Sequence, residues 1–591
     1  MNAWDAAKVT AYIAEIEKNL VSRYPGARSL TAEELARYRP RSPIRGWRLA
    51  SVGDVPEIDL LILPDFPYTL PRVALVNYNR DMPHIERDGV LCIEQDGTTF
   101  DHTRPTDVVE HELARAATLI KELQGGQHQG DFARDFERYW VHCANESDTL
   151  VISLLEEISA VQHVQAARAG NMVVIADPRE LATQWVRNRF GTDTEPERCV
   201  AVLCPLAQAP KPSEYPTDGT SLFRYLDRAC PQGAQIVRQI AKNWPREVLV
   251  VFCIDRTPKP AALGAIRLSV AITRGKGKKR HPLAKGEPGG IVSQWAAAAK
   301  VERLPVRRAE AAWVHGRYTD AHLPQLKAKT VAIIGVGSLG ARIAQFLAQS
   351  GIGNLALIDA DVFDLANASR HVLGADALGR NKAEAVASML RRSLPHHEGV
   401  VAYPETWQQI FRNNSEILTR ANLILSLTGN WNADAALSDL QHSAVPMPPV
   451  IYGWVEPYAC AAHGVLLKAS GPCLRCHFSN TGRADLHITE WPEDVETVPV
   501  CGAVHTPFGA AALGFAQAML ASMAIDALLS NSEAGEWRVW TSTEAEVTAH
   551  GGTVSPHWVD VFGGLGEKPR IQHLSWRQSE LCRACRVGAP T

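Results

Sequence analysis

Three glycines spaced as Gly335-x-Gly337-x-x-Gly340 follow a short apolar run, Val331 to Ile334. The run predicts a buried strand, and the spacing places the glycines where a helix begins. Glycines let backbone amides approach a phosphate closely, and the positive end of the helix dipole favours its negative charge. Asp359 ends a second apolar run, and its carboxylate can accept hydrogen bonds from both ribose hydroxyls. The stretch therefore predicts a nucleotide site.

Polar and cationic side chains follow this turn, and a dinucleotide dehydrogenase would not need such a cluster. They are Asp361, Asn367, Arg370, Arg380 and Lys382. Arginine offers a planar fork to phosphate oxygens and lysine a point charge, and together they suit an adenylation transition state, in which pyrophosphate leaves. A single Lys or Arg commonly lies on a solvated helix face, so it is the ordered series that indicates a triphosphate.

Two C-x-x-C pairs, Cys473 with Cys476 and Cys582 with Cys585, supply four thiolates. Four sulfur ligands suit a closed tetrahedral zinc site. The gap between the pairs is too long for a free-standing zinc finger, so we expect the metal to hold the C-terminal tail against its domain. One pair alone would also suit redox chemistry, but two pairs favour structural zinc.

Two further cysteines stand outside metal spacing. Cys92 ends a short apolar run and precedes a polar loop, a placement that favours an accessible thiol. Cys501 precedes a glycine-rich turn and a long helix of small residues, whose N-terminus would lower the pKa of the thiol. A thiolate is the nucleophile that acyl transfer needs. The alternative for each is a small buried hydrophobe, the usual fate of a lone cysteine, and for Cys501 also a spare thiol near the zinc.

The nucleotide motif resembles that of the ThiF and ubiquitin-activating superfamily over roughly the last half of the chain. The matching residues are Gly335, Gly337, Gly340, Asp359, Asp361, Asn367, Arg370 and Lys382. The resemblance implies a Rossmann-like domain that uses ATP and Mg²⁺ to adenylate the C-terminal carboxylate of a protein. It implies that Arg370 and Lys382 stabilise charge, that Cys501 accepts the acyl group, and that a crossed zinc staple closes the domain. It further implies a homodimer in which Arg317 reaches the partner's ATP.

One element of that family's site is missing. The family has an aspartate that helps to hold magnesium next to an asparagine, and here Gly429 stands before Asn430, after an expected strand at 423–427. Asp434 and Asp361 are the substitutes that the sequence offers.

The first 145 residues resemble a ubiquitin-conjugating domain. The resemblance depends on the order of a helix, alternating strands, a proline-rich crossing segment, His84, Cys92 and closing helices. The expected elements are a helix at 3–23, strands at 47–52, 58–63 and 73–76, and helices at 107–123 and 131–142. It implies that Cys92 carries a thioester to a modifier.

The His-Pro-Asn motif of conjugating domains is absent, because His84 is followed by Ile85 and Glu86. The group that would steady the oxyanion is therefore unassigned. His84, Asp101 and His102 are candidates to orient or deprotonate the incoming amine, although each is more often a polar loop residue.

At 591 residues the chain is too long for one core and is expected to divide into about three or four domains. We predict a multidomain α+β and α/β protein with a ubiquitin-conjugating-like α+β domain at 1–145, an α/β linker domain at 146–305 and a ThiF-type adenylation domain at 306–591. The linker carries no recognisable motif. Its basic stretch at 274–280 predicts a solvated loop, and its four cysteines, Cys199, Cys204, Cys230 and Cys253, are expected in the core.

Charge and composition limit the partners. The net charge of −3 gives no global field for nucleic acid or membrane. The start of the chain is amphipathic and acidic, without the features of a signal peptide. The most apolar stretch, 509–529, contains Gln517 and Asp526 and is expected to be a buried helix. Twelve cysteines are too sparse for a disulfide scaffold, so we expect a cytoplasmic protein with reduced thiols.

The combined interpretation is a single-chain cascade of ATP-dependent adenylation, thioester transfer through Cys501 and then Cys92, and isopeptide conjugation to an amine. The architecture resembles bacterial activating and conjugating fusions of CD-NTase anti-phage systems (CBASS). That resemblance implies that the activated carboxylate belongs to the nucleotidyltransferase rather than to a ubiquitin-like modifier. Two alternatives stay open. A sulfur-carrier adenylyltransferase would not need residues 1–145, and a catalytically dead nucleotide-binding scaffold would explain the missing asparagine and aspartate.

Overall fold

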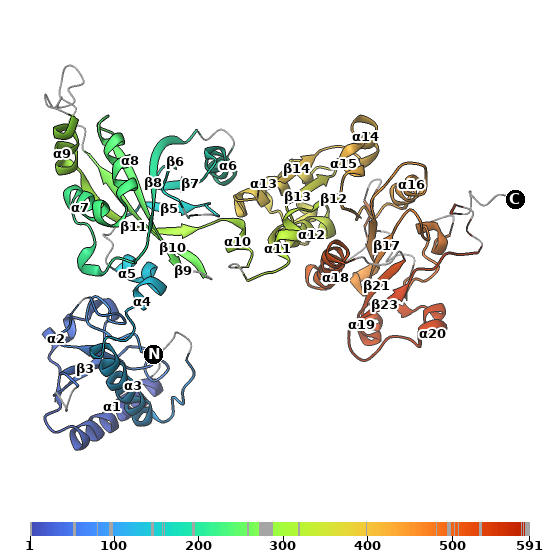
Figure 1. The fold of residues 1–591 in the computed structure, drawn as a ribbon. Coiled ribbons are helices and arrows are strands. Elements are labelled where there is room, and N and C mark those ends of the chain that lie inside the picture. Colours follow the sequence, from blue (N-terminus) through green and yellow to red (C-terminus); the bar gives the residue numbers. More distant parts are fainter. Residues whose placement is uncertain are drawn as a thin grey trace. The chain divides into compact units, whose positions relative to one another are not determined.

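The computed structural model divides the chain into two compact units, Met1–Arg179 with Glu197–Arg307, and Glu180–Pro196 with Arg308–Thr591 (Figure 1). It describes residues 3–50, 55–79, 81–93, 98–142, 147–156, 158, 160–191, 195–256, 259–270, 288–316, 319–397, 399–479, 482–492, 498–500, 503–505, 508–530, 535–580, 582 and 584–585.

The first unit begins with a four-stranded antiparallel sheet in the order β1-β2-β3-β4. On one face Trp47, Leu60 and Val73 pack with apolar residues of α1 and α3, such as Ile16 and Leu113. The elements are α1 (Ala3–Arg23), β1 (Arg28–Ser29), α2 (Ala32–Ala36), β2 (Arg45–Leu49), β3 (Ile58–Ile62), β4 (Arg72–Leu75), α3 (Pro105–Gln124), α4 (Asp131–Arg134) and α5 (Phe136–His142).

Most expected elements of this part are confirmed, with two corrections. The strand expected at 47–52 is β2, which ends at Leu49, where its pairing with Ile58 of β3 ends. The single helix expected at 131–142 is two helices. Asp135 separates them because its backbone (φ −109°, ψ 19°) departs from helical values.

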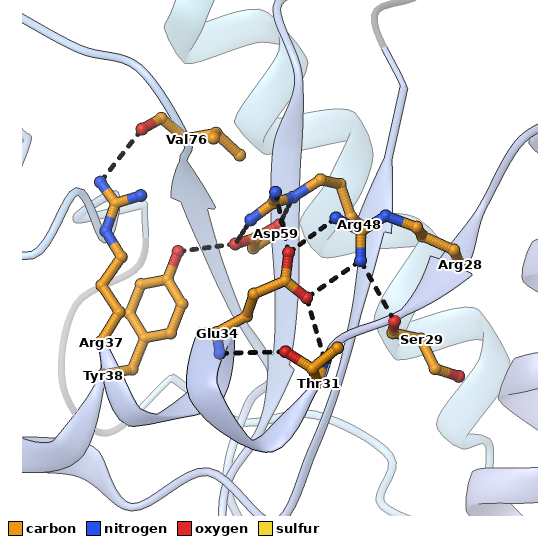
Figure 2. Close-up of polar contacts among 9 residues, drawn as sticks. All are labelled: Arg28, Ser29, Thr31, Glu34, Arg37, Tyr38, Arg48, Asp59 and Val76. Carbon is orange, nitrogen blue, oxygen red and sulfur yellow. Dashed lines mark hydrogen bonds and ion pairs between the residues drawn. The ribbon is translucent and has the colours of Figure 1, made fainter.

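The outer face of the sheet is closed by α2 and a polar network (Figure 2). The carboxylate of Asp59 is fully buried and accepts hydrogen bonds from Arg48 Nε at 2.8 Å and Tyr38 Oη at 2.8 Å. Arg48 also pairs with Glu34 of α2. Burial raises the pKa of the Tyr38 phenol. Because every buried charge in the network has a partner, the network fixes α2 against the sheet.

The rest of the first unit is a closed barrel with strand order β10-β11-β5-β7-β6-β8-β9. The linker is thus α/β as expected, and Cys204, Cys230 and Cys253 are buried in it, whereas Cys199 is only half-buried. The basic stretch 274–280 lies outside the described residues. The elements are β5 (Leu150–Ser153), β6 (Gln162–Ala169), β7 (Met172–Ile175), β8 (Glu197–Leu206), α7 (Gly219–Ala229), α8 (Pro231–Ala241), β9 (Glu247–Arg256), β10 (Lys259–Ser269), α9 (Pro288–Ala298) and β11 (Lys300–Arg308).

The barrel and the four-stranded sheet are joined within the first unit. The indole of Trp140 in α5 is buried and donates to Leu304 O at 3.0 Å, and Glu137 accepts from the amide of Leu263 at 3.2 Å. Asp81 accepts from the Ser213 amide at 3.0 Å. The C-terminal helix of the first domain is therefore anchored on barrel strands.

The second unit is organised around an eight-stranded sheet in the order β14-β13-β12-β15-β16-β17-β21-β23. The first five strands are parallel and the last three are added antiparallel. They are β12 (Thr330–Ile334), β13 (Asn354–Ile358), β14 (Gly399–Tyr403), β15 (Leu423–Ser426), β16 (Val450–Val455), β17 (Ala461–Leu467), β21 (Glu536–Thr541) and β23 (Arg570–Ser575); two short pairs join β18 (Thr489–Glu490) to β22 (Thr553–Val554) and β19 (Val498–Val500) to β20 (Ala503–His505).

Helices cover both faces of this sheet. Val331 and Ile333 of β12 face a core shared with α12, α13 and α18, whereas Ala332 and Ile334 face a second core with α14 and α16. The helices are α6 (Arg179–Phe190), α10 (Ala311–Val314), α11 (Leu323–Lys327), α12 (Ser338–Gln349), α13 (Lys382–Ser393), α14 (Trp407–Asn413), α15 (Glu416–Thr419), α16 (Trp431–Gln441), α18 (Ala510–Leu529), α19 (Glu544–Ala549) and α20 (Pro556–Phe562).

The apolar helix α18 passes a test of length and composition for a membrane span, and half of its apolar stretch is buried inside the fold. Gln517 of α18 donates from Nε2 to Ser338 O at 2.8 Å, and Leu520 and Met523 pack in the same core as β12. The contacts match the expected buried helix.

Asp59→Ala should loosen the N-terminal sheet. The change leaves Arg48 without its buried counter-charge and Tyr38 without an acceptor, a loss of about 3–5 kcal/mol for one partner of a buried ion pair. Amide hydrogen exchange of β2 and β3 in the full chain should become faster. Asp65→Asn, at an exposed aspartate of the same domain, is the control and should leave the rates unchanged. Unchanged exchange in Asp59→Ala would contradict the role given to the network.

Candidate functional site

The glycine turn lies between β12 and α12, as expected from the sequence. Gly335 has φ +86°, and a Cβ on Gly340 would lie 1.9 Å from Gly335 O, so both positions require glycine for the fold itself. A Cβ on Gly337 would meet no atom within 4 Å. Since packing does not demand glycine at 337, the open space beside it suits the close approach of a ligand phosphate to the start of α12.

The carboxylate of Asp359 closes this turn from the end of β13. Its Oδ2 accepts from the amide of Val336 at 2.7 Å, and its Oδ1 accepts from the amide of Asp361 at 2.8 Å. Burial raises the pKa of Asp359. Each oxygen keeps a second lone pair for a ribose hydroxyl, so the expected sugar contact stays a prediction.

Lys382 is the first residue of α13 and lies beside the same strand end. Its Nζ is 2.9 Å from Oδ2 of Asp361; the lysine side chain is 13% exposed and the aspartate side chain 72%. The pair is therefore open on the aspartate side. A polyanionic ligand arriving there would exchange one counter-charge of Lys382 for another.

Asn367 and Arg370 lie on the loop after β13. Asn367 Oδ1 accepts from the Asp364 amide, and Arg370 Nη1 donates to Ala366 O at 2.9 Å. The guanidinium of Arg370 also lies over the ring of Phe508, 5.4 Å from its centroid. Phe508 lies just before the start of α18, so this contact joins the loop after β13 to the beginning of that helix.

Two residues of this site were not singled out from the sequence. His371 is buried, its Nε2 donates to Val336 O at 2.9 Å, and burial lowers its pKa, which keeps the ring neutral. Asn381 donates from Nδ2 to Asp359 O at 2.8 Å and caps α13. An asparagine just before a predicted helix is an N-cap signal that could have identified Asn381. No short-range pattern indicates His371.

The two candidate substitutes for the family's magnesium-binding aspartate, Asp434 and Asp361, have different surroundings. Asn430 caps α16, and Gly429 has φ +62°. Asp434 Oδ1 accepts from Ser426 Oγ at 2.6 Å and from Thr428 Oγ1 at 2.8 Å. Burial raises the pKa of Asp434 to about 6. Asp434 is thus engaged in holding the strand end, whereas Asp361 is exposed.

Two predicted site residues lie outside the described residues. They are Cys501, the expected acyl acceptor, and Arg317. Earlier in the same domain, the buried carboxylate of Glu456 accepts from the amides of Ile488 and Thr489 and from the ring of His463. Glu456 thereby fixes the chain at residues 488–489.

Cys92 is partly exposed at the end of an irregular turn in the first unit. Its amide donates to His84 O at 2.9 Å, and the His84 amide donates to Tyr139 Oη at 2.6 Å. Burial raises the pKa of the Cys92 thiol, and the charge of Arg138 partly offsets this. The thiol is therefore neither free in solvent nor sealed in the core.

The three candidate bases near Cys92 have different surroundings. His84 has φ +58° and its Nε2 lies 2.8 Å from Asp131 Oδ2. Asp101 accepts from Thr103, and the ring of His102 contacts that of Tyr68. Among the described residues, no hydrogen bond joins Asp101 or His102 to Cys92, so His84 alone of the three is tied to the thiol's turn.

The four cysteines of the two C-x-x-C pairs converge on one point. Their sulfurs all lie within 4.8 Å of one another, and the shortest separations are 3.4 Å (Cys473 to Cys582) and 3.5 Å (Cys476 to Cys585). Zn–S bonds of about 2.3 Å place sulfurs roughly 3.8 Å apart in a tetrahedron. Trp576 supports the site by donating to Cys473 O at 3.1 Å. This donor set could bind zinc.

Comparison with known families assigns both ends of the chain. Residues 314–538 match the ThiF family, and residues 22–148 match Prokaryotic E2 family B. The chain is 25% identical over 494 residues to "ATP-dependent ubiquitin transferase-like protein Cap2" of Pseudomonas aeruginosa, covering 78% of this chain and 83% of the relative. The protein of that name from Escherichia coli is 21% identical over 512 residues, with the same coverage.

Among solved structures, that of E. coli MccB with MccA aligns with 44% of this chain and 68% of that chain, at 18% identity and a TM-score of 0.32. A likeness that weak does not bear on function. The family matches confirm the predicted fold classes: the chain is a fused protein with a ubiquitin-conjugating-like (prokaryotic E2 family B) domain and a ubiquitin-activating-like (ThiF-family) domain.

Proposed function

We propose that the chain activates the C-terminal carboxylate of a protein with ATP, passes it through Cys501 and Cys92 as thioesters, and joins it to a lysine amine. The observation that carries this proposal is that one polypeptide combines a nucleotide-type glycine turn with a partly exposed cysteine in an E2-family domain. A sulfur-carrier adenylyltransferase needs only the ThiF-family domain, so the second domain favours conjugation.

Adenylation would occur at the turn of Gly335, Gly337 and Gly340. A carboxylate oxygen of the partner attacks the α-phosphorus of ATP, and pyrophosphate leaves as the acyl adenylate forms. Lys382 and Arg370 carry the positive charge that the leaving group needs, while Asp359 and Asn367 hold the nucleoside side. The partly exposed position of Arg370 and the ion-paired position of Lys382 leave both accessible to an anion.

Magnesium is the metal that ATP chemistry of this kind uses, and it prefers oxygen ligands. Among the described residues, the exposed carboxylate of Asp361 fits better than Asp434, whose Oδ1 already accepts two hydroxyl hydrogen bonds. Bound there, Mg²⁺ would neutralise phosphate charge beside Lys382.

The transfer steps exchange one thioester for another. The Cys501 thiolate attacks the acyl carbon and AMP leaves; the Cys92 thiolate then attacks the same carbon and Cys501 leaves as a thiolate. A lysine amine displaces Cys92 and gives its proton to a base. His84 is the candidate base, because Asp131 holds its Nε2 and leaves Nδ1 for the amine. Fusion of the two domains raises the effective concentration of one thiol for the other.

The partner we propose is a CD-NTase whose own C-terminus is activated. The setting would be cytoplasmic anti-phage defence of the CBASS type. We also propose that the enzyme acts as a homodimer, in which Arg317 reaches the ATP bound by the partner subunit. The likeness to two proteins named ATP-dependent ubiquitin transferase-like protein Cap2 supports ATP-dependent transfer of a protein partner, and the choice of a CD-NTase rests on the resemblance to the CBASS fusions. We further propose that Zn²⁺ occupies the four-cysteine cluster and joins the C-terminal tail to the ThiF-family domain.

Lys382→Ala should lower pyrophosphate exchange into ATP by about 10²–10³-fold, because it removes a cation from the transition state. The exchange is measured with the full chain, ATP, labelled pyrophosphate and a CD-NTase of intact C-terminus. Lys329→Ala, a lysine ahead of β12, is the matched control and should keep full exchange. Absence of exchange with every carboxyl partner would favour the scaffold alternative.

Thiol variants should separate the two transfer steps. With ATP and partner, Cys92→Ala should accumulate an adduct on Cys501 that reducing agents remove, and Cys501→Ala should form none; Cys199→Ala is the control thiol. Because the pKa of Cys92 is raised, the thiol is protonated at neutral pH, and transfer from Cys501 to Cys92 should become faster as pH rises from 7 toward 9. A Cys501→Ala chain that still loads Cys92 would overturn the proposed order. The readout is a non-reducing gel.

Cys582→Ser should release one Zn²⁺ per chain and lower the melting temperature of the ThiF-family domain, because three thiolates do not close a structural site. Bound metal is counted by elemental analysis of the full chain, and unfolding is followed by calorimetry. Cys460→Ser, at a buried cysteine outside the cluster, controls for loss of a core thiol. Equal zinc in both variants would exclude the staple.

A further inference from the structure

We propose that His84, His128 and Asp131 form a second metal site, in the ubiquitin-conjugating-like domain, for a divalent transition-metal ion of the zinc class. Oδ2 of Asp131 lies 2.8 Å from Nε2 of His84 and 3.0 Å from Nδ1 of His128. The three atoms all lie within 4.8 Å of one another. Two imidazoles and a carboxylate are the ligands of zinc and related ions at three-residue sites.

The groups around these three side chains are arranged as the outer shell of a metal site. Nε2 of His128 lies 2.9 Å from Oε2 of Glu122, so the second ring nitrogen of this ligand meets a carboxylate. Such carboxylate-histidine pairs fix the tautomer and the ring orientation of metal ligands. The other oxygen of Asp131, Oδ1, pairs with Arg134 at 2.9 Å. Oδ2, which lies beside both rings, is therefore the oxygen that would share an ion with them.

The backbone holds both histidines in an unusual conformation. His84 has φ +58° and His128 has φ +67°, values that residues with side chains rarely adopt. The two rings lie edge to face with centroids 5.2 Å apart, and the His84 amide donates to Tyr139. An ordinary surface ion pair does not require backbone strain at two residues, so the convergence of both rings on one carboxylate favours a functional site.

The site differs in kind from the four-cysteine cluster. Three protein ligands leave a coordination position open, as at exchangeable or catalytic sites, whereas four thiolates close a structural one. The carbonyl of His84 also accepts the hydrogen bond of the Cys92 amide, so one proposed ligand belongs to the turn that carries the thiol. The inference does not depend on the proposed transfer chemistry, because binding is measured without ATP or partner.

The test is a cobalt titration of the full chain after the four-cysteine cluster has been filled with zinc. We expect one further Co²⁺ per chain, with weak d-d absorption and no sulfur-to-cobalt charge-transfer band. Asp131→Asn and His128→Gln should abolish it. Glu122→Gln, which keeps all three ligands, should weaken binding by about 10–100-fold. His163→Gln, at an exposed histidine of a barrel strand, is the matched control and should bind as the parent chain does.

Each outcome decides the question. A parent chain that takes up no additional cobalt, or cobalt bound equally by Asp131→Asn, would show that the three residues form only a hydrogen-bonded network. If circular dichroism shows that His128→Gln is unfolded, Glu122→Gln decides the question. A ten-fold weaker cobalt affinity with an unchanged d-d spectrum in that variant shows that the ion is bound by His128. Retained affinity in Glu122→Gln overturns the proposal.

Discussion

The contact between Gly340 and the carbonyl of Gly335 is the constraint from which the nucleotide site follows. With only hydrogen atoms between them, the first turn of α12 can lie directly on the end of β12. That closeness places the amide of Val336 where Asp359 can accept it, and Asp359 in turn binds the amide of Asp361. A bulkier residue at either glycine would separate the helix from the strand and move every group that depends on this turn.

Hydrogen bonds link the glycine turn and the end of β13 to the segments that carry the other candidate site residues. The ring of His371 donates to the carbonyl of Val336 in this turn. Asn381 donates to the carbonyl of Asp359 and so fixes the start of α13, where Lys382 lies, at the end of β13. Phe508, just before the start of α18, lies under Arg370. The groups expected to contact the nucleotide are thus positioned by hydrogen bonds to the backbone of a short loop.

Sequence patterns identified the parts of this protein whose signal is local. The glycine turn, Asp359 at a strand end and the two C-x-x-C pairs each occupy a few neighbouring positions, and the structure places them as expected. The barrel could not be derived in this way, because its closure joins strands that are distant in the chain, and periodicity carries no register between them. His371 and the association of His84 with Asp131 were missed for the same reason: His371 contacts Val336, 35 positions away, and His84 contacts Asp131, 47 positions away.

Gly337 differs from Gly335 and Gly340 because the fold itself does not require glycine at this position. The backbone there is not left-handed, and an added methyl group would touch no other part of the protein. Such a methyl would instead occupy the space proposed for a phosphate. An alanine at this one position would therefore separate nucleotide binding from folding, because the described strands and helices would stay in place while the start of α12 becomes less open to a ligand.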